Sequence, residues 1–143
     1  MGYQHHYTNG DVIDLPMGKV VCVGRNYAAH AKELNNPIPT APILFMKPST
    51  AISALSEGVN LPKGQGECHY ETEVAVLIST RMTKANERDV QRAISGLGIG
   101  LDLTLRDVQS QLKENGHPWE RAKAFDGSCP LSGFVPVDEH IKL

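Results

Sequence analysis

The stretch YETEVAVLIS, Tyr70–Ser79, is the part of the chain that decides its structural class. β-Branched residues occupy every second position from Val74 to Ile78, and this period of two predicts a β-strand. Glu71 and Glu73 lie two residues apart in the same stretch, so the same period directs both carboxylates to one face of the strand. The chain is therefore expected to contain a sheet with two acids side by side on one face.

These two glutamates allow two interpretations. Adjacent carboxylates repel each other and favour a cation between them, and Mg²⁺, Mn²⁺ or Ca²⁺ would accept such oxygen ligands. The alternative is a solvated strand face, since charged side chains usually face water. Asp102 follows the glycine-rich stretch 96–101 just before a predicted helix, where a carboxylate can point into a cleft and add a third ligand. It could instead help to cap that helix.

The remaining elements mix short strands with helices. Short apolar runs predict strands at residues 20–23, 43–46 and 96–101. Helical composition predicts helices at residues 27–34, 87–95 and 105–115. The helix-end signals are Asn26, Asn86 and Thr104 as N-caps and Gly116 as a C-terminal residue. Residues 58–66 are turn-rich and residues 117–143 lack a regular pattern, so the expected fold class is α+β and rich in β-structure.

The composition excludes several classes of protein. A length of 143 residues suits a single domain over residues 1–143, and 41% hydrophobic with 21% charged residues exclude a disordered tail or a coiled coil. A formal net charge of −2 provides no general field that attracts nucleic acid or an acidic membrane, so neither is expected as a partner. No apolar run is long enough to span a membrane, and the first residues lack the pattern of a signal peptide.

The cysteines indicate the expected compartment. Cys22, Cys68 and Cys129 are odd in number and include no Cys-x-x-Cys pair. This argues against a disulfide framework and against a thiolate zinc site. Cys22 lies in an apolar run and is expected to be a small buried hydrophobic residue. A reducing cytoplasm is therefore the expected location.

Further polar residues could take part in catalysis or binding. His30 and Glu33 are spaced i, i+3 on the predicted helix at 27–34, so the carboxylate could orient the imidazole as a general base, although a surface ion pair has the same spacing. Arg106 and Gln109 share a helix face in the same way and could bind a carboxylate, or simply form an exposed charged face. Lys123 lies among small and apolar residues and could stabilise an oxyanion.

Taken in order, the motifs resemble the fumarylacetoacetate hydrolase family over nearly the whole chain, with the closest likeness to small bacterial acylpyruvate hydrolase-like members. The blocks that carry the resemblance are VGRNYAAHAKE (23–33), FMKPST (45–50), HYETE (69–73), GLDLTLRDVQ (100–109) and the segment 118–133 from PWERAKAFD to CPLSG. Several blocks in the right order are more specific than any one of them.

The resemblance implies a mixed β-roll and a catalytic site. It implies a Mg²⁺ or Mn²⁺ ion held by Glu71, Glu73 and Asp102. It implies that His30 and Glu33 activate a water molecule, on a segment that orders over the ligand, and that Lys123 stabilises an enolate. The residues expected to hold a small 2-oxoacid are Arg25, Arg106 and Gln109. A homodimer is also implied, as is further chain beyond the region of Leu143, because the family's roll continues there with more strands and a Gly-Thr-Pro-containing loop.

The implied activity is the metal-dependent hydrolysis of a C–C bond in acylpyruvates (2,4-dioxo acids), which yields pyruvate and a carboxylic acid. Water attacks the distal carbonyl, and the pyruvate enolate leaves because its charge is stabilised. Decarboxylation of oxaloacetate gives the same enolate without an attacking water, and its enol–keto tautomerisation uses the same stabilisation. An oxaloacetate decarboxylase or tautomerase is therefore the first alternative, and an inactive fragment or structural subunit is the second.

Overall fold

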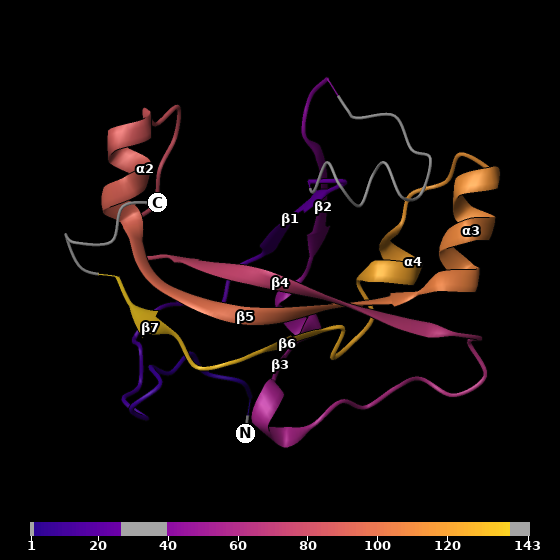
Figure 1. Cartoon of the computed structure of the whole chain (residues 1–143), viewed down its shortest axis with the longest axis horizontal. Coiled ribbons are helices and arrows are strands. Elements are labelled where there is room, and N and C mark those ends of the chain that lie inside the picture. The colour runs from indigo at the N-terminus through magenta and orange to yellow at the C-terminus, as the bar shows by residue number, and fades with distance from the viewer. Residues whose placement is uncertain (1, 27–39, 138–143) are drawn as a thin grey trace.

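The computed structural model describes residues 2–26 and 40–137, and strands predominate over helices in this part of the chain (Figure 1). The elements are, in order, β1 (Val20–Gly24), β2 (Ile43–Lys47), η1 (Ser49–Ala51), β3 (Ile52–Ala54), η2 (Leu55–Glu57), β4 (Cys68–Ile78), α2 (Glu87–Ala93), β5 (Ile94–Leu105), α3 (Arg106–Glu114), α4 (Glu120–Lys123), β6 (Cys129–Leu131) and β7 (Val135–Pro136). The helix expected at residues 27–34 lies outside the described residues.

β4 and β5 form a long antiparallel pair at the centre of the structure. Figure 1 shows both strands crossing the molecule, with α2 at one end of β5 and α3 at the other. The strand expected at 70–79 is confirmed as β4. Its register places Glu71 opposite Asp102 and Glu73 opposite Gly100. Residues that are directly opposite in neighbouring strands project to the same face, so the acids of β4 share a face with Asp102.

β5 is longer than its sequence pattern predicted. The expected strand ended at residue 101, but β5 continues to Leu105 because β4 provides pairing partners along its whole length, back to Cys68 opposite Leu105. Asp102 and Thr104 therefore lie inside a strand. The expectation that Thr104 caps the following helix is wrong, since Leu105 takes the N-cap position of α3. The alternative that Asp102 caps this helix is wrong too, because its carboxylate pairs with Lys47 and Lys123.

The sheet that contains β4 and β5 is mixed. Its strand order is β3-β6-β5-β4, with β7 also paired to β5, and only the β3–β6 pair is parallel among the pairings of the described strands. Several segments pack closely against β5, and the glycines of this strand make room for them. A Cβ at Gly98 would lie 3.1 Å from both the Phe134 ring and the Ser132 hydroxyl, so the absence of a side chain lets the 129–136 segment pack against the strand. β1 and β2 pair separately as a two-stranded antiparallel sheet.

The hydrophobic core lies where β3, β4 and β6 meet the N-terminal segment. Its buried members include Ile13, Ile52, Leu77, Leu131 and Phe134. The N-terminal segment reaches this core through main-chain pairing of Tyr7 with Phe134. Burial of these apolar side chains is the main favourable contribution to folding, and it stabilises the sheet that carries Glu71 and Asp102.

The described helices follow local signals in part. The Asn86 side chain accepts a hydrogen bond from the Asp89 N–H and caps α2, as expected, but α2 ends at Ala93 because β5 begins at the next residue. Gly116 follows α3 with a φ of +64°, which confirms it as a helix-end residue. The irregular C-terminal region contains α4, β6 and β7, which its sequence did not predict. Within the described ranges, no helix has the length and apolar character needed to cross a membrane.

Candidate functional site

The acids of β4 and β5 begin a polar cluster at the α3 end of the strand pair. Asp102 is buried, and Glu71 opposite it keeps 34% of its side chain exposed. Glu73 lies two residues further along β4 on the same face. The structure therefore brings Glu71 and Asp102 together from neighbouring strands, and it does so because β5 continues past the glycine-rich stretch.

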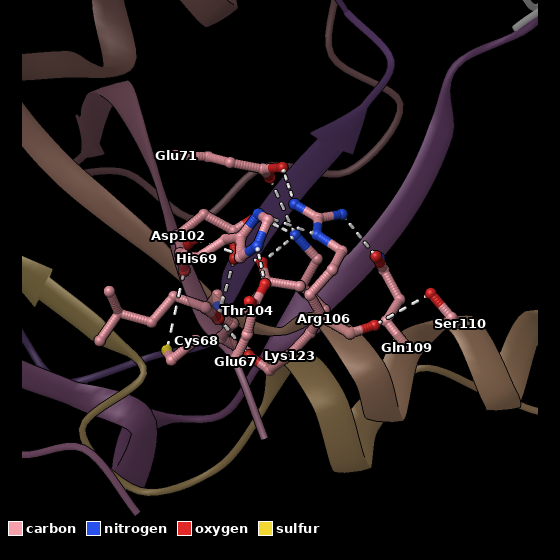
Figure 2. A network of polar contacts seen from close by, with 12 residues as sticks. Glu67, Cys68, His69, Glu71, Asp102, Thr104, Arg106, Gln109, Ser110 and Lys123 are labelled. Atoms are coloured by element: carbon pink, nitrogen blue, oxygen red, sulfur yellow. Dashed lines mark hydrogen bonds and ion pairs between the residues drawn. The ribbon is translucent and has the colours of Figure 1, made fainter. Parts of the chain in front are cut away.

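Lys123 lies between these two acids. Its Nζ donates to Glu71 Oε2 at 3.0 Å, to Asp102 Oδ2 at 2.6 Å and to the Thr104 hydroxyl at 2.6 Å (Figure 2). An ammonium has three protons, and these three acceptors use all of them. The side chain is only 4% exposed, so the expected desolvation of Lys123 is found, together with two carboxylates that compensate its charge. Short α4 holds this lysine against β5.

Lys47 is a second buried cation, and the sequence reasoning missed it. Its side chain is fully buried, with Nζ 2.9 Å from Asp102 Oδ1, and it donates to Leu103 O and to the Ser128 hydroxyl at 3.2 Å each. It also donates to the main-chain carbonyl of Lys123. The available signal was the period of two along β2, which places Lys47 on the same face as the more buried residues of that strand.

Arg106 is held at the first turn of α3 by partners from two elements. Its Nη2 donates to Glu71 Oε1 at 2.7 Å, and its Nη1 donates to Gln109 Oε1 at 2.7 Å. Its Nε donates to His69 Nδ1 at 3.3 Å, and Figure 2 shows these side chains converging on the guanidinium. The prediction that Arg106 and Gln109 share a helix face is therefore confirmed, and His69 is a further member of the cluster.

The positive charges of the cluster lower the pKa of Glu71. Burial alone would raise the pKa of Glu71, but the hydrogen bond from Arg106 and the charge and hydrogen bond of Lys123 together lower this pKa to about 2. Burial raises the pKa of the Cys22 thiol to about 12, with the Asp102 charge adding to the effect. Cys22 is half-buried rather than fully buried, and all three cysteines are free thiols, as expected. Because the pKa of Glu71 is lowered to about 2, this residue carries its negative charge throughout the physiological pH range.

Of the remaining predicted site residues, only Arg25 belongs to the described part of the chain. Arg25 directly follows β1 and adopts a left-handed conformation with φ of +53°. It is exposed, and its positive charge contributes to lowering the pKa of Lys113, after the larger effects of burial and Arg106. His30 and Glu33 lie outside the described residues.

The donor chemistry of the acids fits a hard divalent ion. Glu71, Glu73 and Asp102 supply only carboxylate oxygens, which Mg²⁺ and Mn²⁺ prefer. Among the described residues, buried Asp102 Oδ1 has the Lys47 ammonium at 2.9 Å as an ion-pair partner but accepts no hydrogen bond, so it retains capacity to bind a cation. As the side chains are arranged, no three His, Cys, Asp or Glu residues of the described ranges surround one point closely enough to hold a metal. A bound ion would have to share Glu71 and Asp102 with the Lys123 ammonium.

Comparison with known proteins places these features in a family. The family model described as Fumarylacetoacetate (FAA) hydrolase C-terminal matches residues 19–142. The chain is 53% identical over 137 residues to oxaloacetate tautomerase YcgM of Escherichia coli (strain K12). The aligned region covers 96% of this chain and 63% of that protein.

Solved structures agree with this assignment. A fumarylacetoacetate hydrolase family protein from Yersinia pestis CO92 superposes with a TM-score of 0.92 and 52% identity, over 96% of this chain and 63% of that one. Fumarylpyruvate hydrolase from Pseudomonas aeruginosa, in complex with Mn²⁺ and pyruvate, gives a TM-score of 0.82 and 34% identity, over 94% and 60% of the two chains. The chain thus spans about three fifths of the length of the relatives it matches. These likenesses confirm the resemblance and the strand-rich α+β fold class expected from the sequence blocks.

Proposed function

Because the chain belongs to the fumarylacetoacetate hydrolase family, we propose that it provides the enolate-stabilising site of an oxaloacetate tautomerase. The observation that carries this proposal is the Lys123 ammonium between Glu71 and Asp102, with the Arg106 guanidinium on the other oxygen of Glu71. Two fixed cations beside one another suit a substrate that bears a carboxylate next to a developing enolate oxygen. The relative that shares 53% identity is named for this activity.

The reaction moves one proton and breaks no C–C bond. In the keto-to-enol direction, a base takes a proton from C3 of oxaloacetate, and the C3–H electron pair forms the C2–C3 double bond. The C2 oxygen then gains a proton, and the base returns its own proton to solvent, so the balance is one proton moved. The intermediate is an enolate whose charge lies on that oxygen. The positive charge of the Lys123 ammonium can stabilise this oxygen, while Arg106 and Gln109 hold a substrate carboxylate. The low exposure of Lys123 strengthens its electrostatic effect.

We propose Mg²⁺ or Mn²⁺ as the cofactor, with Glu71, Glu73 and Asp102 as its ligands. When bound, such an ion would act as a Lewis acid toward the oxygens of a 2-oxoacid. The presence of Mn²⁺ and pyruvate in the solved fumarylpyruvate hydrolase supports this cofactor and this substrate class. Addition of Mn²⁺ at about 100 times its dissociation constant is expected to stabilise the protein by about 2.7 kcal/mol, measured by thermal unfolding.

Acylpyruvate hydrolysis, the leading expectation from the sequence, becomes the second candidate. The fumarylpyruvate hydrolase that supports it is 34% identical, against 53% for the tautomerase. The activities make different demands, because hydrolysis needs a base that activates water, tautomerisation needs a base for the C3 proton, and decarboxylation needs neither. His30→Ala should therefore abolish hydrolysis and leave part of any decarboxylase activity.

The deciding experiment measures three activities on one metal-loaded preparation. The decay of enol absorbance reports tautomerisation, and pyruvate release reports decarboxylation of oxaloacetate or hydrolysis of acylpyruvates. We expect tautomerisation to be the fastest and to fall about 100-fold or more in Glu71→Gln, as for loss of a key electrostatic group. Glu57→Gln, at an exposed carboxylate outside the cluster, is the matched control and should stay within about twofold. Faster acylpyruvate hydrolysis, or equal rates in the two variants, would overturn the proposal.

We also propose that the protein acts as a homodimer. The face of β4 opposite the acids exposes apolar side chains, namely Tyr70, Val74, Val76 and Ile78, which are 71%, 67%, 46% and 43% exposed. Contiguous apolar patches of this kind commonly mark interfaces. Size-exclusion chromatography with light scattering tests this point, and a monomer at all concentrations that support activity would contradict it.

A further inference from the structure

His69 is a residue that neither the sequence motifs nor the proposed chemistry assigned a role. It lies on β4 two residues before Glu71, so the two side chains share a strand face. Figure 2 shows its ring beside the Arg106 guanidinium. His69 Nδ1 lies 3.3 Å from Arg106 Nε, and His69 Nε2 lies 3.2 Å from Glu67 Oε2.

The chemistry of these contacts defines their direction. A guanidinium Nε–H can only donate, so His69 Nδ1 must accept, and the ring proton then lies on Nε2. From Nε2 it is donated to the Glu67 carboxylate. The result is a directed chain of hydrogen bonds that runs from Arg106 through His69 to Glu67. A single exposed ion pair would contribute little on its own, but here each group orients the next.

The backbone around Glu67 is fixed to the start of α3. The Arg106 N–H donates to Glu67 O at 2.8 Å, and the Glu67 N–H donates to Asp107 Oδ2 at 3.0 Å. Gly66 has a φ of +79°, and a Cβ at this position would collide with the Asp107 carboxylate. Only glycine allows this close approach, so the segment that precedes β4 is clamped to the helix that carries Arg106.

We infer that His69 is a positioning residue that sets the orientation of Arg106. Arg106 keeps 30% of its side chain exposed, so packing alone does not hold it. Glu71 and Gln109 bind its two terminal nitrogens, and His69 binds Nε, which prevents rotation of the guanidinium plane. These three bonds use three of the five N–H groups, and no described residue accepts from the other two, which can bind a substrate carboxylate. His69 therefore acts through Arg106 and does not itself touch substrate.

The kinetic consequence rests on the proposed function, in which Arg106 holds the carboxylate of a 2-oxoacid. Loss of the His69 contact should raise KM for oxaloacetate about fivefold, as expected for one hydrogen bond. The value of kcat should change less than about twofold, because Lys123 and the acids remain in place. A merely structural role would instead lower the amount of folded protein and leave the KM of the folded fraction unchanged.

Two substitutions and one control separate these cases. His69→Asn keeps an acceptor, since the amide oxygen can take the place of Nδ1, whereas His69→Leu removes it. His117→Leu changes an exposed histidine beyond α3 and serves as the matched control. The first readout is the Nε–H NMR signal of Arg106 in the metal-free protein, assigned by its disappearance in Arg106→Lys. This readout does not depend on any activity.

We expect the Arg106 Nε–H signal to persist in His69→Asn and in the control, and to shift or vanish by exchange with water in His69→Leu. The rise in KM should follow the same pattern, with rescue by asparagine. An unchanged signal in His69→Leu, or the same KM in the asparagine and leucine variants, would overturn the inference. If the wild-type protein has no activity on oxaloacetate, the proposed function fails, but the NMR comparison still decides the role of His69.

Discussion

Replacement of Lys47 by methionine removes the buried ammonium that connects β2 with β5. Methionine keeps the unbranched shape of the side chain, so the change is mainly one of charge and hydrogen bonding. Asp102 Oδ1 would lose a cation at 2.9 Å, and Leu103 O and the Ser128 hydroxyl would each lose a donor at 3.2 Å. All of these atoms belong to buried residues, so water cannot easily replace the ammonium.

The magnitude follows from the number of partners that remain. Removal of one member of a buried ion pair typically costs about 3–5 kcal/mol. Asp102 keeps the Lys123 ammonium at 2.6 Å, so we expect the lower end, about 3 kcal/mol of unfolding free energy. Asp102→Asn should also destabilise, because it removes the carboxylate that pairs with both buried lysines. The double variant removes one charge of each sign, so its cost should fall about 2 kcal/mol short of the sum of the single costs.

The assay is urea unfolding followed by circular dichroism, with a chelator present so that no metal contributes. Lys63→Met, at an exposed lysine in the irregular loop before β4, is the control and should change stability by no more than about 0.5 kcal/mol. Our account of the cluster would be refuted by either of two results. One is a cost below about 1 kcal/mol for Lys47→Met, and the other is strict additivity in the double variant.

Three further predictions test the cluster, the sheet and a helix cap. The pKa of Glu71 is lowered from 4.5 to about 2, so its stabilising effect is complete above pH 4.5 and is lost as the pH falls toward 2. The difference in unfolding free energy between wild type and Glu71→Gln should be about 1–2 kcal/mol after solvent screening. This difference should shrink between pH 4.5 and 2 in chelator-treated samples. Gly98→Ala should lower the free energy of unfolding by about 1–3 kcal/mol, since its Cβ would press on Phe134, while Gly18→Ala, with nothing within 4 Å, should not. Asn86→Ala should cost about 1 kcal/mol in the same denaturation assay through loss of the α2 cap, and an unchanged midpoint would contradict that role.

Several features could be predicted from the sequence because they depend on near neighbours along the chain. Alternation of residues defines β4, and it also places Glu71 and Glu73 on one face. The caps of α2 and α3, Asn86 and Gly116, act within one helical turn of their own positions. The order of the sequence blocks was enough to identify the family, which the matching family model over residues 19–142 confirms.

Other features depend on strands and helices that are distant in the sequence. Leu101, Leu103 and Leu105 alternate with Asp102 and Thr104, but this short pattern leads directly into a helix and did not by itself define the end of the strand. The pairing of β5 with β4 extends the strand through Asp102 to Leu105. Lys47 was missed as part of the site, because its partners lie 55 or more positions away in the sequence. His69 was likewise unremarkable until α3 brought Arg106 beside it.

The sequence by itself determined the strand-rich class, the family and the two acids that share a face of β4. Tertiary structure alone decided that Asp102 faces Glu71, that Lys123 lies between them and that Lys47 is buried behind Asp102. The physical reason is that period and capping act over a few residues, whereas charge compensation acts through space. A buried carboxylate requires a cation, but nothing local in the chain specifies which distant lysine provides it.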